Sequence, residues 1–197
     1  MNWLLYLIFP IEIIFRSIRK IQLISRNIFE TNKLQSCGSH FRCGYNLQIQ
    51  NQGIMSFGNH LEFGSNVQVS TYSKGKIEIG DHVLVGDGTK IISGDANITI
   101  GKDSLIAEYV SIRSSNHGIV NDFPIRSQEN QYIDIEIGRD VWIGRGVMIT
   151  AGSNIQDGVV IGANSVVTKS LITEKNAVYV GNPARFLYFR PSQQDTN

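Results

Sequence analysis

The sequence predicts an all-β domain built as a three-sided coil of short parallel strands. A bulky apolar residue recurs at every sixth position from Phe57 onward, glycine often follows it, and a small or aliphatic residue often stands four places later. A period of six fits neither an α-helix nor the simple alternation of a flat strand. It fits one short strand and one corner per six residues, with three sides to a turn and turns stacked about 4.8 Å apart. The repeated apolar residues are Phe57, Phe63, Val69, Ile79, Val85, Ile91, Ile100, Ile106, Ile112, Ile137, Ile143, Ile149, Ile155, Ile161 and Val167.

Gaps in this series predict where loops leave the coil. The series runs without a break over 137–171, but earlier it stops after Val69, Ile91 and Ile112, each time after a third side. The extra residues should therefore project from one and the same corner. The longest of them form a protruding loop at 113–136, and because long loops in compact domains are commonly functional, we expect chemistry there.

Residues 1–33 have a different pattern, which predicts an amphipathic helix with a basic side. Apolar residues recur at helical spacing after Pro10, with basic residues between them: Ile11, Ile14, Phe15, Ile18 and Ile21, and Arg16, Arg19 and Lys20. Two interpretations stay open. The favoured one packs this helix on the body of the protein or on a partner subunit, and the other places residues 1–24 in peripheral contact with a membrane surface.

Neither a membrane span nor a secretory signal is expected. The longest apolar run, 3–9, is far shorter than the ~20 residues that cross a bilayer. No basic stretch precedes it and no small-residue cleavage site follows. Cys37 and Cys43 are the only cysteines, and we expect structural thiols in an irregular first turn. These features predict a cytoplasmic protein, peripheral at the inner membrane surface if the helix contacts lipid.

The composition fits one globular domain without a nucleic-acid-binding surface. The 197 residues allow a coil domain at 34–187 and a tail at 188–197. Eighteen basic against 17 acidic residues leave a net charge of +1, which supplies no broad positive field. No glycine-rich phosphate loop follows a predicted strand, so nucleotide hydrolysis and dinucleotide binding are poor interpretations.

The histidines are candidates for metal binding or for catalysis. His60 and His82 occupy the same place in adjacent repeats and should stack at one corner, where Asp103 and Asp140 continue the column. Because zinc sites normally need three or four arranged ligands, we predict solvent-facing corner residues and no metal site. His117 differs, since it lies in SSNHGIV at the root of the loop. A neutral imidazole there can accept a proton at neutral pH, although an exposed polar residue is the simpler interpretation.

One run of sequence carries a family resemblance. VWIGRGVMITAGSNIQDGVVIGANSVVTKS, followed by VGNPAR, resembles the hexapeptide-repeat acyltransferases, which fold as a left-handed parallel β-helix. It is most similar to the O-acetyltransferases of sugars and bacterial surface polysaccharides, relatives of the maltose and galactoside acetyltransferases. The resemblance covers 57–187. The left hand is implied by the family alone, because strand crossovers are normally right-handed.

The resemblance implies a role for His117. Sugar O-acetyltransferases place their catalytic base at the start of this loop, where His117 stands. Asn116, Asp122 or Glu129 could hold the imidazole in one tautomer, and Glu129 ranks first because it approximately matches an acidic position of the family. The catalytic residues expected are therefore His117, Asn116 and Glu129.

Two further residues are expected in the substrate cleft. Strand alternation points the Trp142 ring outward, and the resemblance places it between neighbouring subunits, near acceptor and cofactor. The alternative is packing against 113–136. Arg145 stands where the galactoside enzymes carry serine, so its guanidinium or a backbone N–H would have to serve the thioester oxygen.

The resemblance also implies acetyl-CoA as co-substrate, with no metal. Backbone groups would meet the pantetheine arm, polar and basic side chains the pyrophosphate, and a turn the adenine end. The matching positions are Gly144 and Ala163, then Thr168 and Lys169, then Gly181, Asn182, Pro183 and Arg185.

The expected protein is a homotrimeric, acetyl-CoA-dependent O-acetyltransferase. Its acceptor would be a sugar hydroxyl of a bacterial surface polysaccharide such as capsule or O-antigen, including a lipid-linked glycan. A trimer is expected because a lone prism leaves its outer face bare and because the family builds its sites between subunits. Two alternatives remain: N-acetylation of an amino sugar on the same fold, and a non-catalytic trimeric scaffold.

Overall fold

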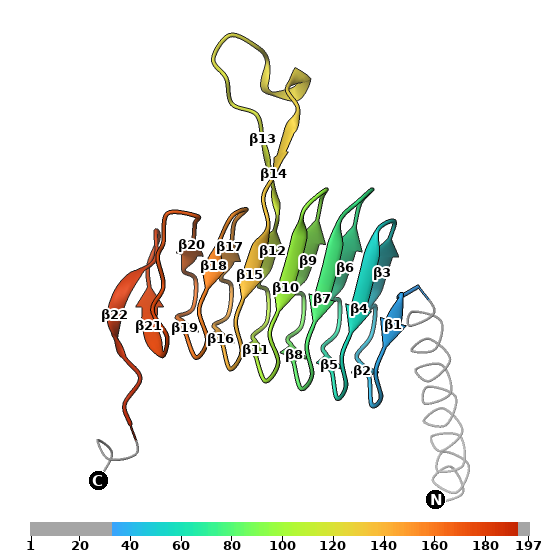
Figure 1. Cartoon of the computed structure of the whole chain (residues 1–197), viewed down its shortest axis with the longest axis vertical. Coiled ribbons are helices and arrows are strands. Elements are labelled where there is room, and N and C mark those ends of the chain that lie inside the picture. The colour runs from blue at the N-terminus through green and yellow to red at the C-terminus, as the bar shows by residue number, and fades with distance from the viewer. Residues whose placement is uncertain (1–32, 193–197) are drawn as a thin grey trace, which may run out of the picture.

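The computed structural model describes residues 33–192, so the predicted N-terminal helix lies outside the described residues. The described chain forms a three-sided β-solenoid in which parallel strands stack turn upon turn (Figure 1). This confirms the all-β, coiled fold expected from the six-residue repeat. No helix in the described part is long and apolar enough to cross a membrane.

Each side of the coil is one parallel sheet. The first face contains β1 (Ser36–Cys37), β4 (Ile54–Phe57), β7 (Lys76–Ile79), β10 (Asn97–Ile100), β15 (Ile135–Ile137) and β18 (Asn154–Ile155). The third face contains β3 (Gln48–Asn51), β6 (Gln68–Thr71), β9 (Lys90–Ser93), β12 (Ser111–Arg113), β17 (Met148–Ile149) and β20 (Val166–Val167).

The second face is the longest and ends in a hairpin. It contains β2 (Arg42–Cys43), β5 (Glu62–Phe63), β8 (Leu84–Val85), β11 (Leu105–Ile106), β16 (Trp142–Ile143), β19 (Val160–Ile161), β21 (Ala177–Val180) and β22 (Arg185–Phe189). The last two strands pair antiparallel. The boundary predicted between 187 and 188 therefore falls inside a strand, because the chain turns back and continues the sheet.

The hydrophobic core fills the inside of the coil. Every repeated apolar residue is buried there, from Phe57 to Val167, because strand alternation points this position inward on all three faces. Most small residues four places later are buried as well. Ser73 is an exception: it is exposed because it lies in an insertion and not at a corner of the coil.

The insertions leave the coil at one corner, between the third and the first face, as the gaps predicted. This insertion corner carries the segments 72–75, 94–96 and 114–134. The last of them extends far beyond the others and holds the two-stranded ribbon β13 (Ser115–His117) and β14 (Asn130–Tyr132), with η1 (Ile125–Ser127) in the connection (Figure 1).

Candidate active site

His117 lies on the projecting ribbon, away from the body of the coil. It ends β13 and is paired with Asn130 in antiparallel register. Its side chain is exposed. An accessible imidazole on a projecting hairpin can exchange a proton with a bound molecule, but one chain supplies little around it to bind that molecule.

The register separates His117 from its predicted orienting residues. The backbone N–H of Gly118 donates to the carbonyl of Glu129 over 3.1 Å, so Glu129 lies opposite Gly118. Successive residues of a strand point to opposite faces, which puts Asn116 and Glu129 on the face away from His117. Within residues 33–192, the His117 side chain makes no hydrogen bond or ion pair with any residue. The register alone turns Asn116 and Glu129 away from it, and their orienting role stays a prediction.

The loop beyond the ribbon is closed by the side chain of Gln128. Its Oε1 accepts from the Val120 N–H over 2.8 Å, and its Nε2 donates to the carbonyls of Val120 (3.0 Å) and Phe123 (2.8 Å). The side-chain amide thus makes hydrogen bonds to the loop backbone like those that a neighbouring strand would make. The loop so held presents exposed apolar side chains, Ile119, Val120, Phe123 and Ile125.

Trp142 lies on the outer side of the second face, as alternation predicted. Its register partners are Leu105 on the preceding turn and Val160 on the next, and Leu84 continues the column. The indole is 53 % exposed. The 113–136 loop leaves from the insertion corner, so the alternative that this loop packs on Trp142 of the same chain is not observed.

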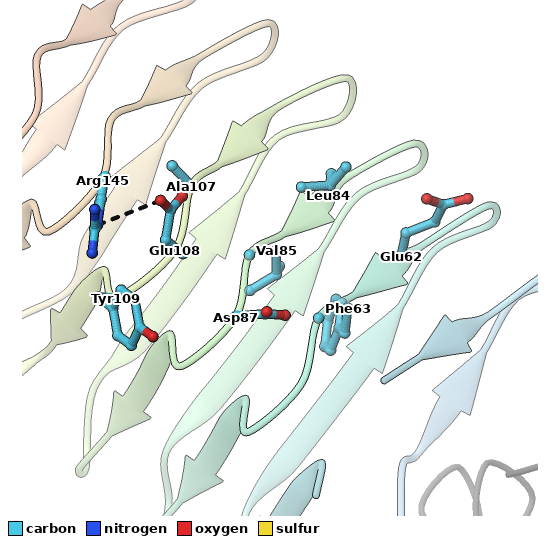
Figure 2. Close-up of a pocket in the computed structure, with 11 residues that line it drawn as sticks. Glu62, Phe63, Leu84, Val85, Asp87, Ala107, Glu108, Tyr109 and Arg145 are labelled. Carbon is cyan, nitrogen blue, oxygen red and sulfur yellow. Dashed lines mark ion pairs between the residues drawn. The ribbon is translucent and has the colours of Figure 1, made fainter. Parts of the chain in front are cut away.

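A groove of about 600 Å³ runs beside Arg145, along the corner between the second and third faces (Figure 2). We call this the second corner. The Nε of Arg145 lies 3.4 Å from Oε1 of Glu108, and its Cζ lies 5.3 Å from the centroid of the Tyr109 ring. Glu62 and Asp87 also line the groove, so it carries more negative than positive charge.

Most of the predicted coenzyme residues lie on this same corner, one turn apart. The Asn164 N–H next to Ala163 donates to the Arg145 carbonyl over 2.8 Å, and the Val166 N–H donates to the Gly181 carbonyl over 3.0 Å. A Cβ on Gly144 would lie 2.7 Å from the Ala163 nitrogen, so the turns approach closely only because glycine stands there. Asn182, Pro183 and Arg185 continue the corner after Gly181.

Thr168 and Lys169 lie elsewhere. They follow β20, at the insertion corner, so the third face separates them from Ala163 and Gly181. The Cβ of Lys169 is 3.0 Å from where a Cβ on Gly152 would stand, and Ile133 at the root of the ribbon meets the same point. The coenzyme residues expected from the sequence are therefore divided between two corners of one chain.

Comparison with known proteins shows the family to which this chain belongs. Residues 134–169 match the family model described as bacterial transferase hexapeptide (six repeats). The putative lipopolysaccharide biosynthesis O-acetyl transferase WbbJ of Escherichia coli is 35 % identical over 147 residues, covering 71 % of this chain and 74 % of that protein. The chain is a hexapeptide-repeat acetyltransferase. The galactoside O-acetyltransferase of E. coli is 31 % identical over 145 residues, or 73 % of this chain and 61 % of that one.

Solved structures agree with the fold of this hexapeptide-repeat acetyltransferase. AntD, an N-acyltransferase from Bacillus cereus solved with dTDP-4-amino-4,6-dideoxyglucose and coenzyme A, superposes with a TM-score of 0.73. It is 22 % identical and covers 86 % of this chain and 90 % of its own, a likeness that shows the fold alone. The polysialic-acid-specific acetyltransferase NeuO has a TM-score of 0.54 at 27 % identity, over 83 % of this chain and 82 % of its own.

The structure of this acetyltransferase adds a third histidine to the stack predicted from the sequence. His40 stacks on His60 with ring centroids 4.4 Å apart, and His60 stacks on His82 at 4.8 Å. The expectation of only two stacked imidazoles was wrong because the first turn was taken as irregular. His40 precedes His60 by twenty residues, close to the length of one turn, and this spacing could have predicted the third ring of the stack. Among residues 33–192, no three His, Cys, Asp or Glu side chains are arranged to hold a metal ion.

Proposed function

We propose that this protein is an acetyl-CoA-dependent O-acetyltransferase acting on a sugar hydroxyl of a bacterial surface polysaccharide. The observation that carries the proposal is the exposed His117 imidazole at the end of β13, the first strand of the projecting ribbon. The name of the 35 % identical WbbJ, a lipopolysaccharide O-acetyl transferase, supports the choice of acceptor. The proposed place of action is the cytoplasm, at the inner membrane surface if residues 1–24 contact lipid and do not pack on the protein or on a partner subunit.

The proposed reaction is a direct transfer with His117 as general base. Nε2 of the neutral imidazole takes the proton of the acceptor hydroxyl while the hydroxyl oxygen bonds to the thioester carbonyl carbon. The carbon–sulfur bond then breaks, and the imidazolium returns the proton to the departing sulfur. The products are an acetyl ester and the free thiol of coenzyme A. Arg145 stands on the groove as a donor for the negative charge that develops on the thioester oxygen.

The coenzyme would lie along the second corner. The close approach of Gly144 to Ala163 leaves a narrow backbone edge, suited to the amides of a pantetheine arm. Arg185 is exposed and donates one N–H to the Ala184 carbonyl over 2.9 Å, so most of its donors face outward for phosphate. Thr168 and Lys169, at the insertion corner, would contact a coenzyme bound to a neighbouring subunit.

A homotrimer is proposed because one chain does not assemble the site. His117 stands on the loop of the insertion corner, whereas Trp142 and Arg145 stand on the second face and the second corner. The loop tip and the Trp142 column are both exposed and apolar. Three chains in a closed ring can bury each loop tip against the second face of the next chain. This arrangement would place His117 of one subunit over Arg145 of another.

One alternative function is N-acetylation of an amino sugar, a class of reaction that the shared fold accommodates, since AntD with this fold is an N-acyltransferase. An amino group needs the same base, so the residues named above would serve an amino sugar as well. Acetyl transfer to matched hydroxy and amino acceptors distinguishes the two. A trimeric scaffold without activity, the other alternative, predicts no acetyl-CoA binding by calorimetry.

The substitution His117→Ala tests the proposal. We expect kcat to fall by about 10²- to 10⁴-fold, the usual contribution of a general base, with acetyl-CoA affinity and the oligomeric state unchanged. Asn121→Ala, an exposed polar residue in the same loop, is the control for a change of loop structure. Undiminished turnover of the true acceptor by His117→Ala would remove His117 from the mechanism.

A further inference from the structure

One face of the projecting ribbon brings four polar side chains together. His117 is paired with Asn130, and Ser115 with Tyr132. The backbone hydrogen bonds are made by the flanking pairs, from Gly118 N–H to the Glu129 carbonyl (3.1 Å) and from Ile133 N–H to the Ser114 carbonyl (3.0 Å). His117 and Asn130 therefore form a non-hydrogen-bonded pair, the type in which facing side chains lie closest, with Cα atoms about 4.5 Å apart.

The amide of Asn130 is oriented by Tyr132. Its Nδ2 donates to the Tyr132 hydroxyl oxygen over 3.3 Å. Tyr132 lies two residues along the same strand and on the same face, so this bond directs the NH₂ group away from His117. The other end of the amide, Oδ1, is thereby left as the acceptor on the side of the imidazole.

Tyr132 is itself held against the coil. Its ring covers the backbone of Gly94, where any Cβ would collide with Cδ1 and Cε1 of the ring. The Gly94 N–H donates over 3.2 Å to Oγ of the fully buried Ser114, the residue from which the ribbon starts. The position of the Tyr132 hydroxyl is thus fixed relative to the solenoid and not only to the ribbon.

We propose that Asn130 is a positioning residue for His117. The structure contains no hydrogen bond between the two side chains. In the proposed arrangement Oδ1 accepts one from Nδ1–H of the imidazole, the ring nitrogen that a short cross-strand side chain can reach. The neutral ring is then held in the tautomer with a lone pair on Nε2, which points outward. The role of that lone pair rests on the proposed function, whereas the tautomer itself does not.

The other two candidates for orienting His117, Glu129 and Asn116, lie on the opposite face of the ribbon. Glu129 is opposite Gly118, and Asn116 is opposite Gln131, so both carboxylate and amide leave the ribbon on the side away from His117. The groups that share the His117 face in its ribbon are Ser115, Asn130 and Tyr132, and none of them is an acidic or basic side chain.

The first test reads the tautomer directly. Two-bond ¹H–¹⁵N correlation spectra of the full-length protein above pH 7, with His117 assigned by the loss of its signals in His117→Gln, report which ring nitrogen carries the proton. We expect the Nδ1–H form in the wild type and a mixture of tautomers in Asn130→Ala. Gln131→Ala, on the opposite face, is the matched control and should leave the wild-type form. An Nε2–H ring in the wild type, or no change in Asn130→Ala, would overturn the proposal.

The second test measures kinetics. One of its expected results, a shift of the pH profile, is not produced by a loss of folded structure. Asn130→Ala should lower kcat by about 10- to 100-fold, with the KM for acetyl-CoA within about twofold. Asn130→Asp should move the acidic limb of the kcat/KM profile to higher pH, because a carboxylate beside the ring stabilises the imidazolium. Gln131→Ala, on the opposite face of the ribbon, should change neither. Wild-type kcat in Asn130→Ala, or an unmoved limb in Asn130→Asp, would speak against Asn130.

The two tests separate this inference from the proposed function. If His117→Ala keeps full activity, His117 is not the base, and the spectra still decide whether Asn130 fixes its ring. If His117→Ala is inactive while Asn130→Ala is unaffected in both tests, the base stands and the positioning role is refuted. Tyr132→Phe should give an intermediate loss of kcat, because it frees the amide without removing it.

Discussion

Arg145 places its guanidinium carbon 5.3 Å from the centroid of the Tyr109 ring, one turn away along the second corner. A cation over an aromatic face is stabilised electrostatically, and the carboxylate of Glu108 at 3.4 Å restrains the same side chain. Both contacts act on a side chain that is still 63 % exposed beside the groove, at the position where the galactoside enzymes that the sequence resembles carry serine. Arg145 is held over the groove in which the thioester would lie.

This restraint predicts a difference between two substitutions. Arg145→Ala should lower kcat by about 10²-fold, because a donor to the developing oxyanion is lost. Arg145→Ser should keep most of the activity, because it restores the hydroxyl that the resemblance places there. Steady-state kinetics at saturating acetyl-CoA measure both. Equal kcat values for the alanine variant and the wild type would show that Arg145 does not act on the reacting centre.

The division of the site between chains predicts complementation. His117→Ala and Arg145→Ala trimers should each be nearly inactive, but co-expressed chains should regain about a quarter of wild-type activity. In random mixtures, one site in four then takes both intact residues from different subunits. Activity of the purified mixed trimers measures this. No recovery would place both residues of each site in a single chain.

The apolar repeat predicts where the coil is most sensitive to truncation. Ile112 is fully buried on β12, directly before the projecting segment. Ile112→Ala should lower the free energy of unfolding by about 2–5 kcal/mol, because it leaves a cavity between closely stacked turns. Urea denaturation measures the loss. Lys90→Ala, on the outer side of the same face, is the control, and an equal effect of both substitutions would contradict the assignment of inner and outer positions.

The carboxylate of Asp157, at a corner of the coil, predicts that the folded protein is less stable in acid. Asp157 accepts from the Arg139 N–H over 2.9 Å and from its guanidinium over 3.1 Å, and Lys175 lies 3.7 Å away. The backbone N–H of Arg139 first, and then its side chain, hold the pKa of Asp157 below its usual range. A folded pKa below the unfolded one stabilises the protein above the unfolded pKa. That contribution disappears as the pH falls through the folded pKa.

The variant Asp157→Asn should therefore be less stable than the wild type at pH 7, and the difference should vanish in acid as the pH falls through the lowered folded pKa of Asp157. Urea unfolding curves across this range measure it. Asp122→Asn, in the projecting loop, controls for the change of net charge. A difference between Asp157→Asn and the wild type that does not change with pH would mean that the carboxylate acts by shape and not by charge.

The sequence by itself determined the coil and the positions of its insertions. Each six-residue side contains one short strand, so an inward-facing residue recurs every six positions. The repeat is visible in the sequence alone, and Ile106, Ile143 and Ile161, which belong to it, are all buried. Trp142 was predicted outward by the same alternation. His117 was found because the gap in the repeat exposed its loop, and the resemblance supplied its role.

Only the tertiary structure decided which residues of the loop face one another. Glu129 ranked first from the sequence because it approximately matches an acidic position of the resembling family. The antiparallel register instead sets Asn130 opposite the imidazole and turns Glu129 away. A one-residue change of register would reverse this outcome. The pairing depends on where Tyr132 rests against Gly94 and on the closure of the loop by Gln128, contacts that no repeat in the sequence encodes.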